Sequence, residues 1–165
     1  MIPIDQTVLR LPTDPSGPPG NCFAACIASI LEIPIDQIPQ PNSDDVENWG
    51  RDGGYWERLA KWLRSIGWHL LDCAQPWPWS TAMEADYEGC YWIASGPGPR
   101  GSKHSVVCCG WQIAHDPHPS RAGLMEIDGK PQVERCSYLV PLDPGQWTPR
   151  FRDPWQTPGR RLEGR

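Results

Sequence analysis

The stretch GNCFAACIASILE, residues 20 to 32, decides the fold of this chain. Asn21 is a favoured residue at the N-cap of a helix, and the residues after it are apolar except for Ser29 and Glu32. A helix that is apolar on nearly every side is normally buried over most of its surface. The stretch therefore predicts a central buried helix that follows Asn21 and ends before Pro34.

The residues that come next predict a second helix and then a series of strands. From about residue 52 to Ser65, apolar side chains recur at the spacing of an amphipathic helix, and Gly67 is placed to end it. Runs of β-branched and aromatic residues predict strands over 68–73, 90–95, 104–110, 111–115 and 136–142. Helices that precede a run of short strands indicate an α+β fold, with the central N-terminal helix packed on an antiparallel β-sheet.

Length and composition indicate one loop-rich domain with a tail. The chain has 165 residues, which suits one hydrophobic core and is too short for two. Its 20 prolines and 16 glycines cluster between the periodic segments and toward both ends. We therefore expect one domain over residues 1–142 and a Pro/Gly/Arg-rich C-terminal tail over residues 143–165.

Charge and hydropathy argue against two classes of partner. The chain has 15 basic and 20 acidic residues, a net charge of −5, whereas nucleic-acid-binding proteins usually carry a basic surface. No run of 18 apolar residues occurs, so no membrane-spanning segment is expected. The opening segment MIPIDQTVLRLP has an acidic residue where a signal peptide has positive charge. We therefore expect a cytoplasmic protein with no nucleic-acid or membrane partner.

The cysteines are odd in number, which in the absence of a secretion signal indicates reduced thiols and not a disulfide framework. There are seven of them, at positions 22, 26, 73, 90, 108, 109 and 136. No pair has the C-x-x-C spacing of a structural zinc knuckle. The sequence therefore predicts neither a metal site nor another cofactor.

Cys22 differs from the other cysteines because it stands in the first turn of the central helix, directly after Asn21. The unpaired N–H groups and the positive end of the helix dipole stabilise a thiolate at such a position. The same N–H groups can stabilise the oxyanion that forms when a thiolate attacks a carbonyl. Cys26, one turn further along, is predicted to pack in the core as a small apolar residue. An inert, buried thiol is the alternative for Cys22 as well.

The segment HSVVCCGWQIAHDP, residues 104 to 117, predicts a hairpin that brings a carboxylate to a histidine. His104 begins one strand, a tight turn at Gly110 reverses the chain, and Asp116 follows the return strand. Asp116 can then accept a hydrogen bond from one imidazole nitrogen while the other faces a thiol. A lone histidine at a strand end is more often a surface or core residue, so it is the pairing with Asp116 that indicates catalysis.

Together these two segments resemble the papain-like cysteine peptidase superfamily, most closely the double-glycine leader peptidases and their stand-alone relatives. In that group a cysteine opens the central helix, a histidine opens a strand with the pattern H-x-V-V, and Asp-Pro ends the next strand. The resemblance covers roughly residues 6 to 142, with specific motifs at 20–31 and 104–117. It extends to phage and prophage proteins with segments similar to HDPHPSRAGL, which suggests a phage-encoded member that acts in a host cytoplasm.

The resemblance implies that Cys22 is the nucleophile, His104 the general base and Asp116 the residue that orients the base. It also implies an oxyanion-hole glutamine a few residues before the nucleophile. The only upstream glutamine, Gln6, lies 16 residues away and fits only if LPTDPSGPPG is an excursion of the chain. Asn21 or the backbone of the nucleophile can serve in its place.

The expected function is a cysteine hydrolase of peptidase or isopeptidase type, which cleaves an amide or thioester bond through an acyl-enzyme. The resemblance implies a peptide or protein substrate, with glycine before the scissile bond as the first expectation. Trp77, Trp79 and Trp92 are candidates to line a groove for an extended peptide, with core packing as the alternative for each. Two other functions stay open: an acyltransferase with the same triad, and a non-catalytic peptide- or protein-binding module on the same scaffold.

Two further segments have competing interpretations. HDPHP places His115 and His118 on either side of Asp116, a set that suits a first-row metal ion, but strand alternation puts His115 on the opposite face from Asp116. ASGPGPRGSK, residues 94 to 103, resembles a phosphate-binding loop only superficially, because it lacks the following helix and its prolines remove N–H donors. Its place before the histidine predicts a flexible wall of the active cleft.

Overall fold

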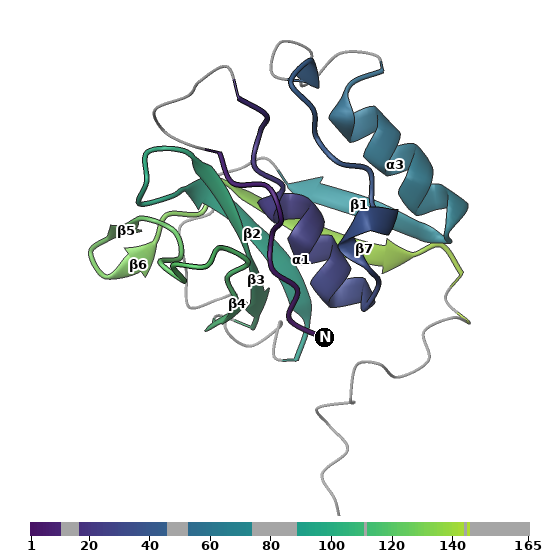
Figure 1. Cartoon of the computed structure of the whole chain (residues 1–165). Coiled ribbons are helices and arrows are strands. Elements are labelled where there is room, and N and C mark those ends of the chain that lie inside the picture. Colours follow the sequence, from purple (N-terminus) through teal and green to yellow (C-terminus); the bar gives the residue numbers. More distant parts are fainter. Residues whose placement is uncertain (11–16, 46–52, 74–88, 111, 144, 146–165) are drawn as a thin grey trace, which may run out of the picture.

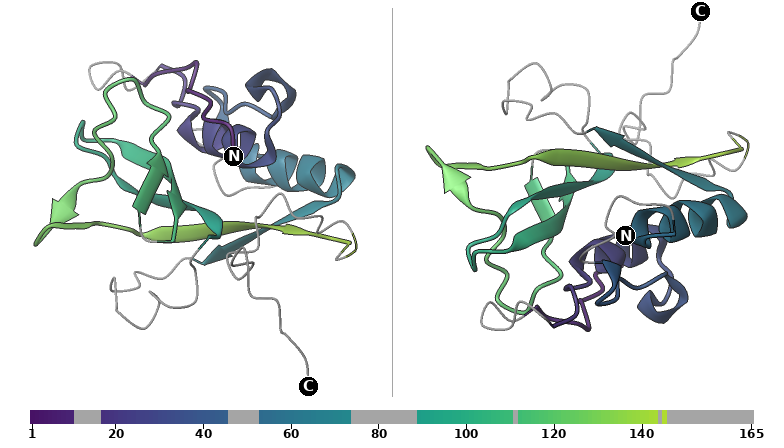
Figure 2. Two further views of the ribbon diagram at one scale, coloured as in Figure 1. Left: turned by 90° about the horizontal axis from the view of Figure 1, so that it is seen from below. Right: turned by 90° about the horizontal axis from the view of Figure 1, so that it is seen from above.

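Two helices pack on one face of an antiparallel sheet in the computed structural model of this chain (Figure 1, Figure 2). The structure describes residues 1–10, 17–45, 53–73, 89–110, 112–143 and 145. This arrangement confirms the predicted α+β class. Within those ranges no helix combines the length and the apolar character needed to cross a bilayer.

The first helix, α1 (Cys22–Leu31), has the predicted position and is almost wholly buried. It ends where Glu32 adopts a left-handed backbone conformation, with φ of 58°, and donates its N–H to the carbonyl of Ala28. Ser29 is fully buried, and its hydroxyl donates to the backbone carbonyl one turn earlier. Asn21 occupies the N-cap position, but its side chain makes no capping hydrogen bond, in contrast to the expectation from sequence.

A short 3-10 helix, η1 (Ile35–Gln37), and a second α-helix, α3 (Tyr55–Ser65), follow. Leu59 is one of the α3 side chains that are fully buried against the sheet, as the predicted apolar stripe requires. Arg58 on α3 donates two hydrogen bonds to the buried Asp45 carboxylate, at 3.0 and 2.8 Å. This ion pair holds the loop before α3 against the helix.

Five strands form one antiparallel sheet in the order β1-β7-β2-β3-β4. Each matches a predicted strand to within two residues at either end. The strands are β1 (Trp68–Cys73), β2 (Tyr91–Pro97), β3 (Lys103–Cys109), β4 (Gln112–His115) and β7 (Arg135–Pro141).

A small hairpin of β5 (Glu126–Ile127) and β6 (Lys130–Pro131) was not predicted. Two residues per strand are too few to show an alternating pattern. The signal that could have found it is the Asp-Gly pair between the strands. Asp128 and Gly129 both have positive φ, 53° and 73°, as a tight hairpin turn requires.

Alternate residues of β2 and β3 belong to two separate core clusters, because neighbouring side chains of a strand point to opposite faces. Ile93 and Val107 pack with the helices, whereas Trp92 and Val106 belong to the cluster on the other face. Trp92 is stacked on Tyr138 and donates its indole N–H to a backbone carbonyl, so it is a core residue and lines no groove. Trp77 and Trp79 lie outside the described residues.

An N-terminal strap, residues 1–8, lies beside α1 and runs from its end to its start (Figure 1). The contacts follow in chain order: Met1 with Glu32, Ile2 with Ser29 and Val8 with Asn21. The strap also reaches the loop after β4, since the N–H of Gln6 donates to the carbonyl of Pro117 at 3.0 Å. It therefore connects the start of α1 to the end of the β3–β4 hairpin.

The chain leaves the strap after Val8 and returns beside it at Asn21, whose N–H donates to the Val8 carbonyl at 3.2 Å. The Asn21 amide nitrogen donates to Thr7 Oγ1 and Gln40 Oε1, at 2.9 and 2.8 Å. Its oxygen accepts the N–H groups of Thr7 and Val8, at 3.1 and 2.9 Å. Asn21 is 1 % exposed, and it closes the excursion that the sequence required for Gln6 to approach the helix.

Replacement of Asn21 by alanine should lower the free energy of unfolding by about 2–4 kcal/mol, because it leaves several buried polar groups without partners. Urea unfolding followed by circular dichroism measures this difference. The exposed Gln112 provides a matched control, and Gln112→Ala should change stability by less than about 0.5 kcal/mol. Equal stability of the two variants would show that Asn21 does not hold the strap to α1.

Candidate functional site

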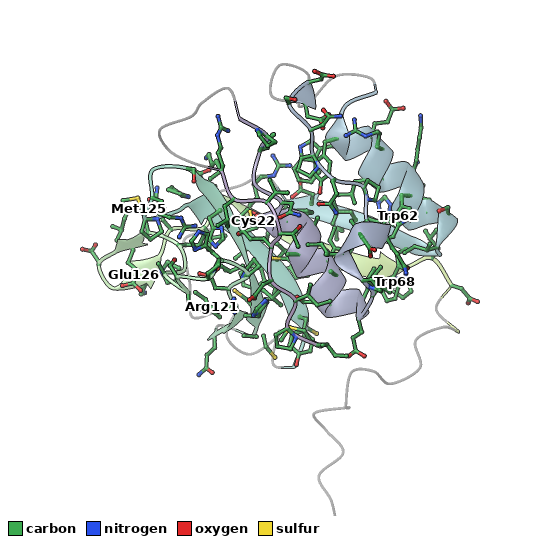
Figure 3. The ribbon with its side chains drawn as sticks, viewed as in Figure 1. Cys22, Trp62, Trp68, Arg121, Met125 and Glu126 are labelled. Carbon is green, nitrogen blue, oxygen red and sulfur yellow. The ribbon has the colours of Figure 1, made fainter. Side chains whose placement is uncertain are left out.

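Cys22 is the first residue of α1 and is partly exposed (Figure 3). The start of α1 points toward the end of the sheet where β2 and β3 are joined (Figure 1). Cys26, one turn further along, is fully buried, and burial raises its pKa well above the ordinary thiol value. Burial likewise raises the pKa of Cys108 to about 12 and that of Cys136 to about 11. These three thiols are inert by environment, and Cys22 is not in such a position.

His104 lies beside Cys22 although the two residues are 82 positions apart. It is the second residue of β3, at the rim of the sheet, and only 2 % of it is exposed. Its Nε2 is 2.7 Å from Oδ1 of Asp116. Cys22 is among the groups that act on the ring, and since Nε2 is occupied by that carboxylate, Nδ1 is the nitrogen available to the thiol. The ring thus lies between a thiol and a carboxylate.

Three donors hold the Asp116 carboxylate in place. Oδ1 accepts from His104 and from the N–H of His118, at 2.7 and 2.8 Å, and Oδ2 accepts the N–H of Gly123 at 2.7 Å. Burial would raise the pKa of Asp116, but these hydrogen bonds outweigh it and lower the pKa to about 2. Asp116 is therefore a fixed anion at neutral pH.

The pKa of His104 shows the opposite balance. Burial of the ring would lower the pKa, because a charged imidazolium loses hydration. The hydrogen bond to the Asp116 carboxylate and then the interaction with Cys22 outweigh burial and raise the pKa to about 9. The arrangement can therefore hold a protonated imidazolium beside the Asp116 carboxylate at neutral pH.

Gln6, the predicted oxyanion donor, lies in the same neighbourhood. Its side chain is 9 % exposed, and Nε2 donates to the carbonyl of Val8 at 2.9 Å. A Cβ built on Gly20 would lie 3.5 Å from that nitrogen, which places the amide beside the residues that precede Cys22. An amide nitrogen carries two hydrogens, so one remains for another acceptor.

Asn21, the second candidate for the oxyanion donor, has no side-chain N–H left to offer. Both hydrogens of its amide are donated, to Thr7 Oγ1 and to Gln40 Oε1. Because the Asn21 side chain does not cap α1, it leaves the N–H groups of the first helical turn, which includes Cys22, available as donors. The geometry therefore favours Gln6 and the Cys22 backbone over the Asn21 side chain.

The HDPHP segment separates its two outer histidines. Nε2 of His115 lies 3.0 Å from the carbonyl of Ile4 on the strap, whereas Asp116 faces His104. This agrees with the alternation expected from sequence. Within the described part of the chain, no three His, Cys, Asp or Glu side chains are grouped to hold a metal ion.

Residues 94–103 form no phosphate-binding loop. Half of them are the ends of β2 and β3, and the other half form the turn between these strands, in which the N–H of Gly98 donates to the carbonyl of Ser102 at 2.7 Å. A Cβ on Gly98 would lie 2.9 Å from the Cβ of His104. Absence of a side chain at Gly98 is therefore what allows this turn to pack against the histidine.

Tyr55 is a site neighbour that the sequence did not indicate. It is the first residue of α3 and is 1 % exposed. Burial raises its pKa, with a smaller contribution from Cys22, so the phenol stays neutral. In the sequence, Tyr55 is marked only by the apolar stripe of the predicted helix, and such a stripe predicts core packing alone.

Comparison with known proteins adds no family. A scan against protein-family models, a search of curated proteins and a search of solved structures each gave no match to this chain. What can be inferred about function therefore depends on the geometry of Cys22, His104 and Asp116.

The His104 ring should stay protonated through neutral pH and titrate near pH 9, because Asp116 and Cys22 stabilise its charged form. Asp116→Asn removes one negative charge and should lower this pKa, since burial of the ring then has less opposition. Histidine ring resonances followed by NMR over a pH series measure both values. The exposed Asp36 supplies the control, as Asp36→Asn should leave the titration unchanged. An unaltered His104 titration in Asp116→Asn would contradict the proposed charge balance.

Proposed function

We propose that this chain is a papain-like cysteine hydrolase with Cys22 as nucleophile, His104 as acid and base, and Asp116 as the residue that orients the histidine. The observation that carries the proposal is the buried His104 ring, which is hydrogen-bonded to Asp116 through Nε2 and has Cys22 as its other electrostatic neighbour. A histidine placed between a carboxylate and a helix-terminal thiol has the arrangement that nucleophilic catalysis needs.

The residues can account for each step of such a reaction. The Cys22 thiolate attacks the carbonyl carbon, and the negative charge moves to the carbonyl oxygen. The N–H of Cys22 and the remaining N–H of Gln6 are the donors available to that oxygen. The His104 imidazolium then gives its proton to the leaving group as the carbon–heteroatom bond breaks, which leaves an acyl-enzyme.

The second half of the reaction reverses the roles. Neutral His104 takes a proton from water while the water oxygen attacks the acyl carbon, and the thiolate leaves as the imidazolium forms again. Asp116 keeps the ring in one orientation and one tautomer throughout. An amine or thiol in place of water would make the same site an acyltransferase.

The papain-like assignment has support from the order of the elements. A buried helix opens with the cysteine, a strand has the histidine near its start, and the aspartate follows the next strand. The resemblance to double-glycine leader peptidases makes a peptide or protein with glycine before the scissile bond the proposed substrate. A phage-encoded origin and a cytoplasmic location follow from the same resemblance and belong to the proposal.

Iodoacetamide should alkylate Cys22 at least about tenfold faster than the exposed Cys90, because His104 gives Cys22 a neighbouring imidazolium. Mass spectrometry of peptides from a time series measures the rate at each cysteine. His104→Ala should remove most of the difference, whereas His69→Ala, which changes an exposed histidine on β1, should not. Equal rates at Cys22 and Cys90 in the unaltered protein would favour a non-catalytic binding module.

A benzyloxycarbonyl-Gly-Gly thioester should form a covalent acyl-enzyme with the unaltered chain and none with Cys22→Ala, because the acyl group is carried by the sulfur. Intact-protein mass spectrometry detects the adduct. Decay of the adduct with release of the free acid indicates a hydrolase, and decay that requires an added amine indicates an acyltransferase. A matched Leu-Leu thioester tests the glycine preference. An adduct on Cys22→Ala would show that another residue is acylated.

A further inference from the structure

Two segments form one wall beside His104. The turn between β2 and β3 packs against the ring, since Gly98 has no room for a side chain next to the His104 Cβ. The loop after β4 begins with Asp116, which bonds to the same ring. Arg100 in the turn donates to Oγ of Ser120 in the loop at 2.9 Å, so the two segments are joined.

His118 belongs to this wall and faces the histidine edge-on. The ring centroids of His118 and His104 are 6.1 Å apart, at an interplanar angle of 88°. Nδ1 of His118 accepts the N–H of Ser120 at 3.0 Å, so the proton of the neutral ring is on Nε2. Burial and then the charge of Arg100 lower the pKa of His118, which favours that neutral ring. His118 therefore presents an N–H donor near the base.

Arg100 differs from the arginines of the ion pairs. Arg58, Arg121 and Arg135 each bond to an aspartate: Asp45, Asp5 and Asp72 respectively. Within the described residues, Arg100 bonds only to the neutral hydroxyl of Ser120. A guanidinium has five N–H donors in a planar fork that matches a carboxylate, and among the described residues Ser120 accepts from only one arm of that fork.

The chemistry of the reaction indicates which part of the substrate this wall would contact. The acyl part of a substrate ends on Cys22, and the leaving group must lie next to His104, which protonates it. Groups that lie beyond His104 from the cysteine therefore meet the leaving-group side of the scissile bond. His118 is such a group, because its loop is anchored through Asp116 at the His104 ring nitrogen that the carboxylate occupies. Arg100, in the turn between β2 and β3, is joined to that loop by its bond to Ser120.

We propose that Arg100 and His118 form a specificity subsite for a carboxylate on the leaving-group side of the scissile bond. This inference rests on the proposed hydrolase function. The fork of Arg100 binds the carboxylate, and the Nε2–H of His118 donates to it or to the adjacent carbonyl. The carboxylate is either the free C-terminus of the leaving residue or the side chain of an acidic residue at that place.

Charged and neutral alkylating reagents of matched shape test the subsite. Iodoacetyl-glycine and iodoacetyl-aspartic acid α-amide each carry one carboxylate, and iodoacetyl-glycinamide and iodoacetyl-asparagine α-amide are their neutral counterparts. In each case the Cys22 thiolate displaces iodide, so that a sulfur–carbon bond forms as the carbon–iodine bond breaks. The measured quantity is the ratio of alkylation rates, charged over neutral, at Cys22.

Arg100→Ala should lower this ratio about three- to fivefold, the range expected for loss of one partly exposed ion pair, and Arg100→Glu should lower it further. His118→Ala should lower it as well. The matched control Arg64→Ala removes the same charge from the last turn of α3 and should leave the ratio unchanged. A change confined to the glycine pair identifies a C-terminal carboxylate, and one confined to the aspartate pair identifies an acidic side chain.

Two negative outcomes are distinguishable. Fast alkylation of Cys22 by the neutral reagents, with ratios that are the same in Arg100→Ala and in the unaltered chain, overturns the subsite and leaves the hydrolase standing. Alkylation of Cys22 by the neutral reagents no faster than that of Cys90 overturns the proposed function and the subsite with it.

Discussion

The buried amide of Asn21 is the constraint on which the rest of the site depends. One side chain bonds to the backbone of Thr7 and Val8 and to the side chains of Thr7 and Gln40. These bonds fix the strap at the start of α1, beside Cys22. The N–H and C=O groups of a buried amide are all hydrogen-bonded only when every partner is in place. The strap, the helix start and the loop before α3 are therefore positioned together.

Burial and hydrogen bonding shift the pKa values of Asp116 and His104 in opposite directions. Removal from water alone would raise the pKa of Asp116 and lower that of His104, and would leave both groups neutral. The hydrogen bonds reverse both shifts, because each group provides the charge that stabilises the other. The backbone N–H groups of His118 and Gly123 add to the effect, because they donate hydrogen bonds that replace those of water at the Asp116 carboxylate. An ion pair can therefore persist at the rim of a hydrophobic core.

Much of the fold could be predicted, and the parts that could not have physical reasons. The helix after Asn21 and the five strands have strong local periodicity, and local periodicity is what a sequence displays. The β5–β6 hairpin is too short to show a period. The sequence around Trp92 is equally compatible with a residue that lines a groove and with one that packs in the core. Its stacking on Tyr138 in the structure identifies it as a core residue. The predicted capping hydrogen bond of Asn21 was wrong because its side chain bonds instead to residues distant in the chain, in the strap and at Gln40.

The sequence by itself determined the α+β class, the position of Cys22 at a helix start and the hairpin that pairs His104 with Asp116. Each depends on residues close together in the chain, where spacing alone sets the geometry. The tertiary structure decided what spacing cannot: that His104 meets Cys22 across 82 residues, and that Gln6 reaches the same place through the strap. It also decided that Arg100, Ser120 and His118 form one wall. Such contacts arise from the packing of separate elements, and no local pattern records them.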